Sequence, residues 1–102
     1  MTRGEVWWVE VPGVGRRPGL ILTRQTAIPV LRKVTVVPAT RTVRSIESEV
    51  LLTEDDGMPA RCALTLDNIT TVPKVLLTER ICRLRGDRMV EVCKALAAAT
   101  DC

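Results

Sequence analysis

The pattern of apolar and polar residues predicts a chain built mainly from short strands. Runs rich in Val, Ile and Leu are bounded by Gly, Pro, Asp or Asn, which is typical of strands separated by turns. The segments that fit this pattern are residues 5–11, 19–23, 33–39, 47–53, 61–66 and 78–83. Pro38 should place the third of these at a sheet edge or lie among its last residues, because proline lacks the N–H that a central strand donates.

Helical periodicity is confined to the end of the chain. Apolar side chains recur there on one face at helical spacing: Met89, Val92, Cys93, Leu96 and Ala97. We therefore expect a helix from residue 86 or 87 to about residue 99, with Asp87 as its N-cap. Strands followed by one helix indicate a mainly β (α+β) fold, in which a small, strongly twisted sheet closes toward a barrel and the helix packs against it.

Length and composition indicate one folded domain over residues 1–102. The chain has 102 residues, 46% hydrophobic and 26% charged, which is ordinary for a folded protein and unlike a disordered one. Trp7 and Trp8 are its only aromatic residues. Trp8 shares a strand face with Glu10, so it is expected to be partly exposed, at a subunit contact or as a stacking surface. The alternative is that both indoles simply pack.

The chain lacks the residue patterns of several functional classes. It has no histidine, and Cys62, Cys82, Cys93 and Cys102 form no C-x-x-C pair. We therefore expect the cysteines to be small buried apolar residues or free thiols, and we expect no metal site, no cofactor and no imidazole-based triad. No charged segment followed by an apolar run opens the sequence, and no apolar stretch approaches the roughly 20 residues that span a bilayer. We expect a cytoplasmic protein without membrane contact.

Charge is distributed unevenly along the sequence. The net charge is +3, yet no acidic residue occurs between positions 11 and 46. That segment holds these basic residues: Arg16, Arg17, Arg24, Arg32, Lys33, Arg41 and Arg44. A basic block favours a polyanionic partner such as nucleic acid, whereas the same residues spread over the surface would form no site.

Two arginines stand at the expected start of the second strand, in GRRPGLILT at 15–23. A guanidinium is permanently charged and binds phosphate oxygens in pairs. Pro18 biases Arg17 toward an extended backbone, which limits where its guanidinium reaches. The pair therefore predicts a bound anion. The alternative is that arginines at a strand end only keep a loop in water.

The order and spacing of four strings resemble the MazF/PemK family of bacterial toxins: RGEVWWV at 3–9, RRPGLILT at 16–23, VVPAT at 36–40 and CALTLDNITTVPK at 62–74. The resemblance covers nearly the whole chain. It implies an SH3-like barrel, a homodimer, and a metal-independent, sequence-selective endoribonuclease of single-stranded RNA. It also implies a cognate antitoxin whose acidic, flexible tail lies across the RNA-binding groove. The family's arginine before the proline and threonine ending the third strand act at the scissile phosphate, and they match Arg17 and Thr40.

The residue types suit that chemistry. A ribose 2′-hydroxyl can attack the adjacent phosphate, so the protein must align the RNA and stabilise extra charge on the phosphoryl oxygens. Arg17 offers paired hydrogen bonds, and Thr40 offers a hydroxyl that donates and accepts. Since an arginine pKa of roughly 12.5 to 13.8 makes a poor general base, we assign Arg17 an electrostatic role.

Other polar residues are candidate RNA contacts. Arg41 and Arg44 follow Thr40 in a loop that must pass the flanking nucleotides, and Arg16 either binds a flanking phosphate or lies in solvent. Asp67 and Asn68 match a family stretch near the dimer interface. They either read a base edge and support the site, or stabilise a turn through Asx hydrogen bonds.

Specificity and activity class have open alternatives. The first loop, PGVGRRP, is shorter than in many relatives, so a relative's cleavage sequence cannot be transferred to this chain. A non-enzymatic binder is the competing class, either a gyrase inhibitor on a similar barrel or a plain RNA-binding module. The scarcity of aromatic residues counts against the RNA-binding module, because such modules usually stack bases on several rings.

Overall fold

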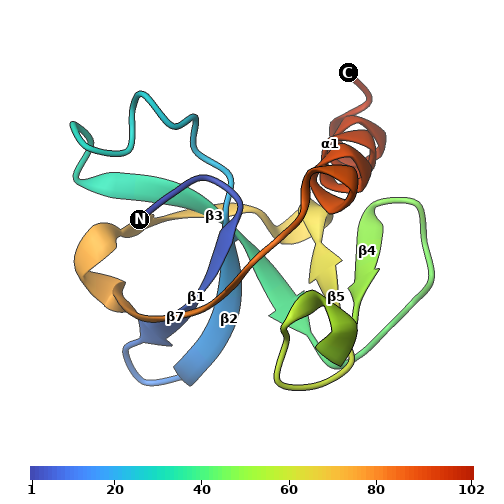
Figure 1. Ribbon diagram of the computed structural model, residues 1–102, viewed down its shortest axis with the longest axis horizontal. Helices are drawn as coiled ribbons and strands as arrows, with labels where there is room; N and C mark the ends of the chain where they lie inside the picture. Colours follow the sequence, from blue (N-terminus) through green and yellow to red (C-terminus); the bar gives the residue numbers. More distant parts are fainter.

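The computed structural model describes all residues from 1 to 102, and its main feature is a seven-stranded antiparallel sheet followed by one helix (Figure 1). The strands are β1 Glu5–Val11, β2 Gly15–Ile21, β3 Lys33–Thr40, β4 Glu49–Leu52, β5 Cys62–Thr65, β6 Thr70–Pro73 and β7 Leu77–Arg83. Short 3₁₀ turns occur at η1 Glu54–Asp56, η2 Leu66–Asn68 and η3 Lys74–Leu76, and the helix is α1 Gly86–Thr100. The predicted mainly β fold with a C-terminal helix is confirmed.

The strand order leaves the sheet open. It runs β4-β5-β3-β2-β1-β7, with β6 paired to β3 beside this path. β4 and β7 therefore form the ends of the path, and no ladder joins them. The expected antiparallel sheet is present, but its closure into a barrel is not confirmed.

β3 is shared by two parts of this sheet. Residues Val36–Pro38 pair with β2, while Ala39 and Thr40 pair with β5. The change of partner falls directly after Pro38, so the missing proline N–H coincides with the end of the β2 ladder. The prediction that Pro38 lies near the end of its strand is confirmed, although the strand continues to Thr40.

The second strand begins earlier than the sequence predicted. It starts at Gly15, so Arg16, Arg17 and Pro18 lie within β2 and pair with β1. Pro18 is tolerated there because the β2–β3 ladder begins only at Gly19. β6 was not predicted at all, since its four residues form a strand only through their pairing with β3.

The core has two parts. The larger cluster packs β4, β5 and the inner sheet face against α1, through residues such as Leu20, Leu52 and Leu64. A smaller cluster of Val9, Ile21, Ile28, Val34, Val36 and Leu77 lies under the β1–β2–β3 side. Gly19 allows β2 to pack closely against its neighbours, because a Cβ at this position would lie only 2.9 Å from a Val9 methyl.

The helix is rotated relative to the prediction. Val92 is buried as expected and Met89 and Leu96 pack partly on the core, but Cys93 and Ala97 are exposed and Ala95 is buried instead. The predicted N-cap is also wrong. Arg85 occupies that position without a side-chain cap, and the Asp87 carboxylate pairs with the Arg85 guanidinium within the first turn.

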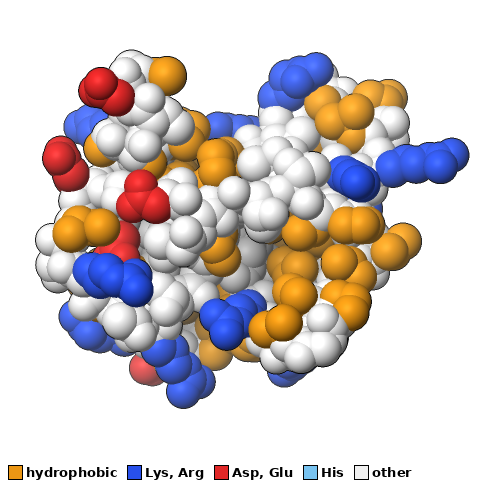
Figure 2. Space-filling view, turned by 180° about the vertical axis from the view of Figure 1, so that it is seen from behind, with side chains coloured by type: hydrophobic (Ala, Val, Ile, Leu, Met, Phe, Trp, Pro, Cys, Tyr) orange, Lys and Arg blue, Asp and Glu red, His pale blue; other side chains and the backbone are white.

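One face of the molecule differs between its two halves. Figure 2 shows acidic side chains on the half that carries α1 and an extensive apolar area on the half that carries β6 and η3. On the latter half Val30 and Val75 are 78% and 84% exposed. No helix of the chain has the length and apolar character needed to cross a membrane.

Candidate active site

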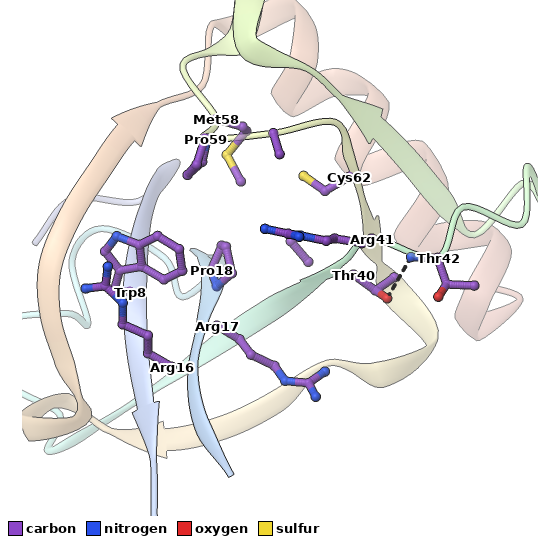
Figure 3. A pocket seen from close by; sticks show the side chains of 12 residues that line it. Trp8, Arg16, Arg17, Pro18, Thr40, Arg41, Thr42, Met58, Pro59 and Cys62 are labelled. Atoms are coloured by element: carbon purple, nitrogen blue, oxygen red, sulfur yellow. Dashed lines mark hydrogen bonds between the residues drawn. The ribbon is translucent and has the colours of Figure 1, made fainter.

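A hollow of about 580 Å³ lies between the β1–β2 hairpin, the end of β3 and the segment that leads into β5 (Figure 3). The hairpin and the end of β3 contribute Trp8, Arg16, Arg17, Pro18, Ala39, Thr40, Arg41 and Thr42. The far wall consists of Met58, Pro59, Ala60 and Cys62. Residues that are distant in sequence thus meet in one concave surface, which is where ligand sites usually occur.

The hairpin sets the first wall through its register. Trp8 lies opposite Pro18, Val9 opposite Arg17, and Glu10 opposite Arg16. Successive side chains leave a strand on opposite faces, so Arg16 and Arg17 point in different directions. Figure 3 shows Arg16 beside the Trp8 ring and the Arg17 guanidinium on the side of Thr40.

The turn after β3 orients the Thr40 hydroxyl. The backbone N–H of Thr42 donates to Thr40 Oγ1 at 3.2 Å, drawn as the dashed line in Figure 3. Because this bond uses the oxygen as an acceptor, the hydroxyl proton remains available for donation to a ligand. The following residue, Arg41, extends its side chain across the hollow toward the hairpin wall (Figure 3).

The far wall is held by a buried ion pair outside the hollow. The Arg88 guanidinium on α1 donates to both carboxylate oxygens of Asp56, at 2.9 and 3.0 Å. Asp56 also accepts from the Thr53 N–H and closes a capping box on η1. Gly57 follows in the left-handed conformation (φ +94°) and redirects the chain into residues 58–60.

The hollow is electropositive. Three arginines line it, and no Asp or Glu does. The Arg17 and Arg41 side chains make no salt bridge or hydrogen bond within the protein, and Arg16 makes only an exposed one to Glu79, at 3.8 Å. Unpaired guanidinium groups that converge on a concave surface favour an anionic ligand such as a phosphate.

Four of the sequence-predicted residues meet here: Arg17, Thr40, Arg16 and Arg41. The other three lie outside the lining. Arg44 instead pairs with the buried Glu49 carboxylate at 3.6 Å. Asp67 accepts a hydrogen bond from the Ser48 hydroxyl, and Asn68 is exposed in η2. A role of these three in RNA binding stays a prediction.

Sequence reasoning missed the whole far wall. Nothing in the local pattern of residues 58–62 indicates a site, because these residues reach it only through η1 and its link to α1. Thr42 was also missed, although Thr40 itself was a signal, because a threonine hydroxyl can accept from the backbone N–H two residues later and so stabilise a turn.

The cysteines and acidic residues form no evident metal centre. No group of three or more Cys, Asp or Glu side chains is close enough to hold an ion. All four cysteines are free thiols, as predicted. Burial, and secondarily the Asp56 carboxylate, raises the pKa of the Cys62 and Cys82 thiols, which favours their neutral forms.

Known proteins resemble this sequence over nearly its whole length. The family model described as "PemK-like, MazF-like toxin of type II toxin-antitoxin system" matches residues 2–100. The probable endoribonuclease MazF5 of Mycobacterium tuberculosis (strain ATCC 25618 / H37Rv) is 46% identical, over 99% of this chain and 94% of its own length.

Solved structures agree with the sequence comparison. The Mycobacterium tuberculosis toxin MazF-mt6 is 31% identical, with a TM-score of 0.88 over 95% of this chain and 96% of its own. A mycobacterial endoribonuclease in complex with its cognate antitoxin has a TM-score of 0.90 at 27% identity, over 99% and 95%. This chain therefore belongs to the PemK-like, MazF-like toxin family of type II toxin–antitoxin systems.

Proposed function

We propose that this chain is the toxin of a type II toxin–antitoxin system, an endoribonuclease that cuts single-stranded RNA at a phosphate bound by Arg17 and Thr40. The observation that carries the proposal is one hollow that combines both side chains with two further arginines and no carboxylate. The relative named above as a probable endoribonuclease supports the same reaction class. The reaction stops growth by removing translatable RNA.

The RNA supplies the nucleophile in this proposal. The 2′-oxygen forms a bond to the neighbouring phosphorus and loses its proton, while the bond from phosphorus to the 5′-oxygen breaks and that oxygen gains a proton. The products are a 2′,3′-cyclic phosphate and a 5′-hydroxyl. The atoms balance without a metal or cofactor, so the proposed reaction proceeds in the presence of a chelator.

The protein contributes charge and alignment. Arg17 donates paired hydrogen bonds to the non-bridging oxygens, on which negative charge increases in the transition state. Thr40 donates its free proton to the same phosphate, since its oxygen already accepts from Thr42. Loss of one preorganised donor of this kind costs about 100- to 1,000-fold in rate.

Two partners complete the proposal. An antitoxin with an acidic, flexible tail binds across the same electropositive hollow and excludes RNA from it, in line with the solved antitoxin complex of a structural relative. A second copy of the chain covers an exposed apolar surface, and Val30 and Val75 are candidate residues of this dimer interface. Such a homodimer works in the cytoplasm, where its substrate is translated.

The test is cleavage of RNA by purified protein in EDTA, with mapping of the new 5′ ends. We expect cuts that leave 5′-hydroxyl groups, and no cut where a 2′-deoxynucleotide precedes the scissile phosphate. Arg17→Ala should stay folded and lose about 100-fold or more in rate. Arg24→Ala is the matched control, because it removes an exposed arginine that does not line the hollow.

Each alternative has its own signature in this assay. Unchanged RNA with capture of gyrase identifies a gyrase inhibitor, and unchanged but bound RNA identifies a plain RNA-binding module. Equal activity of Arg17→Ala and Arg24→Ala would contradict the assignment of Arg17, even if RNA were cut.

A further inference from the structure

We propose that Trp8 forms a stacking subsite for one unpaired base next to the scissile phosphate, and so helps to determine which RNA sequences are cut. This inference rests on the proposed function and names a further residue of the same site. Trp8 is the only aromatic residue that lines the hollow, and it is half-buried there. Stacking on an aromatic ring is the general way in which proteins hold a single-stranded base.

The two tryptophans are in different environments, although they are adjacent in sequence. The Trp7 indole N–H donates to Glu5 Oε1 at 3.2 Å, and its ring packs on the smaller core cluster. The Trp8 indole N–H donates no hydrogen bond within the protein, and its ring belongs to neither core cluster. Trp7 therefore has a structural role, whereas the ring and the N–H of Trp8 are available to a ligand.

The position of the ring relative to the reacting groups is set by β-sheet register. Trp8 lies opposite Pro18, which follows Arg17 directly in β2. In Figure 3 the indole lies at one end of the hollow and Thr40 at the other, with Pro18 and Arg41 between them. An RNA strand whose phosphate is bound by Arg17 and Thr40 therefore extends toward the indole with a flanking nucleotide.

The surroundings favour a neutral, flat group at this end. Pro18 adds apolar surface beside the indole, and Met58 and Pro59 line the far wall across the hollow, so apolar groups border the space that a stacked base would enter. The Arg16 guanidinium lies 4.2 Å from the ring centroid and orients the indole. A base stacks on the other face of the ring or displaces this guanidinium. Displacing the Arg16 guanidinium costs little, because its salt bridge to Glu79 is exposed: the Arg16 and Glu79 side chains are 50% and 70% exposed.

The experiment uses a short RNA that contains the mapped cut site, with a 2′-O-methyl group that blocks attack. Abasic nucleotides replace each position around the scissile phosphate in turn, and fluorescence anisotropy gives the Kd. With wild type, one flanking abasic position should weaken binding roughly 5- to 100-fold, the range for one stacked base. Trp8→Leu should weaken binding of the intact RNA by a similar factor and lose the abasic penalty at that position. Trp8→Phe should retain part of it.

The inference would be overturned if Trp8→Leu kept the same loss of affinity for abasic RNA as wild type at every position. If Trp8→Leu does not fold, the inference is tested by fluorescence quenching in the Trp7→Phe protein, in which Trp8 is the only tryptophan. Intact RNA must then quench Trp8 emission more than RNA with the critical abasic site, and equal quenching overturns the inference. If wild type cuts RNA but shows no such coupling, only this subsite is wrong. Absence of any cleavage refutes the proposed function itself.

Discussion

Removing the Arg88 guanidinium should destabilise the protein strongly, because Asp56 would keep a buried charge without its partner. The Arg88 and Asp56 side chains are only 20% and 7% exposed, and they share two hydrogen bonds of 2.9 and 3.0 Å. Loss of one partner of a fully buried pair costs about 3–5 kcal/mol. The partial exposure of Arg88 and the remaining Thr53 N–H reduce this, so we expect Arg88→Ala to lower the free energy of unfolding by about 2–3 kcal/mol.

Urea denaturation followed by tryptophan fluorescence measures the effect. With a urea m-value of about 1–3 kcal/mol per M, a loss of this size should lower the midpoint by roughly 0.7–3 M. Arg85→Ala is the matched control, since Arg85 makes a similar two-bond pair with Asp87 that is exposed on both sides, and it should change the midpoint little. Equal effects of the two substitutions would refute the reasoning from burial.

The same pair predicts a pH dependence. Hydrogen bonds from Arg88 lower the pKa of Asp56 below its usual value near 3.8, and they outweigh the opposing effect of burial. A lowered carboxyl pKa contributes stability above the unfolded-state pKa, and this contribution is lost as the pH falls through the folded-state pKa. The stability difference between wild type and Arg88→Ala should therefore be full at neutral pH and shrink below about pH 4.

Other positions give further expectations. Arg41→Ala should weaken RNA binding across sequences and reduce the slope of log affinity against log salt by about 0.7, measured by anisotropy at several salt concentrations. Gly19→Ala should cost about 1–3 kcal/mol in urea denaturation, because the new Cβ meets a Val9 methyl at 2.9 Å, whereas Gly86→Ala, with no atom within 4 Å, should cost nothing. Burial alone would raise the pKa of Glu5, but hydrogen bonds from an indole, a guanidinium and a backbone N–H lower it, so Glu5→Gln should reduce stability at neutral pH and much less below about pH 4.

Local pattern was enough to predict most elements of the fold. β-branched runs between turn residues located β1, β3, β5 and β7, and apolar spacing located α1. It failed where pairing with a segment distant in sequence determines whether residues form a strand. The Arg16–Pro18 stretch looks like a loop, yet pairing with β1 makes it a strand. The face of α1 was misplaced because Cys93, Ala95 and Ala97 are all small and apolar, so periodicity does not distinguish them.

The candidate site was likewise only partly predictable from the sequence. Charge, the Arg17–Pro18 pair and the family resemblance pointed to the residues on β2 and at the end of β3, and the fold brings these together. The pairing of Arg44 with Glu49 could not be predicted from the loop sequence, because the two side chains meet only when β4 forms, and its role as a substrate contact stays a prediction. The segment 58–60 has no sequence signal, since its place depends on the ion pair between η1 and α1.

The division of β3 after Pro38 gives the protein a modular architecture. Arg17 and Trp8 are fixed on the β1–β2 hairpin, and Thr40 ends the strand that joins it to β5. The connections 41–48 and 57–61 border the same hollow but add no strand to the hairpin. Directed evolution of a toxin with new cutting preferences can therefore randomise residues 43–47 and 58–60 of these connections, and leave Arg17, Thr40 and the turn at Thr42 unchanged.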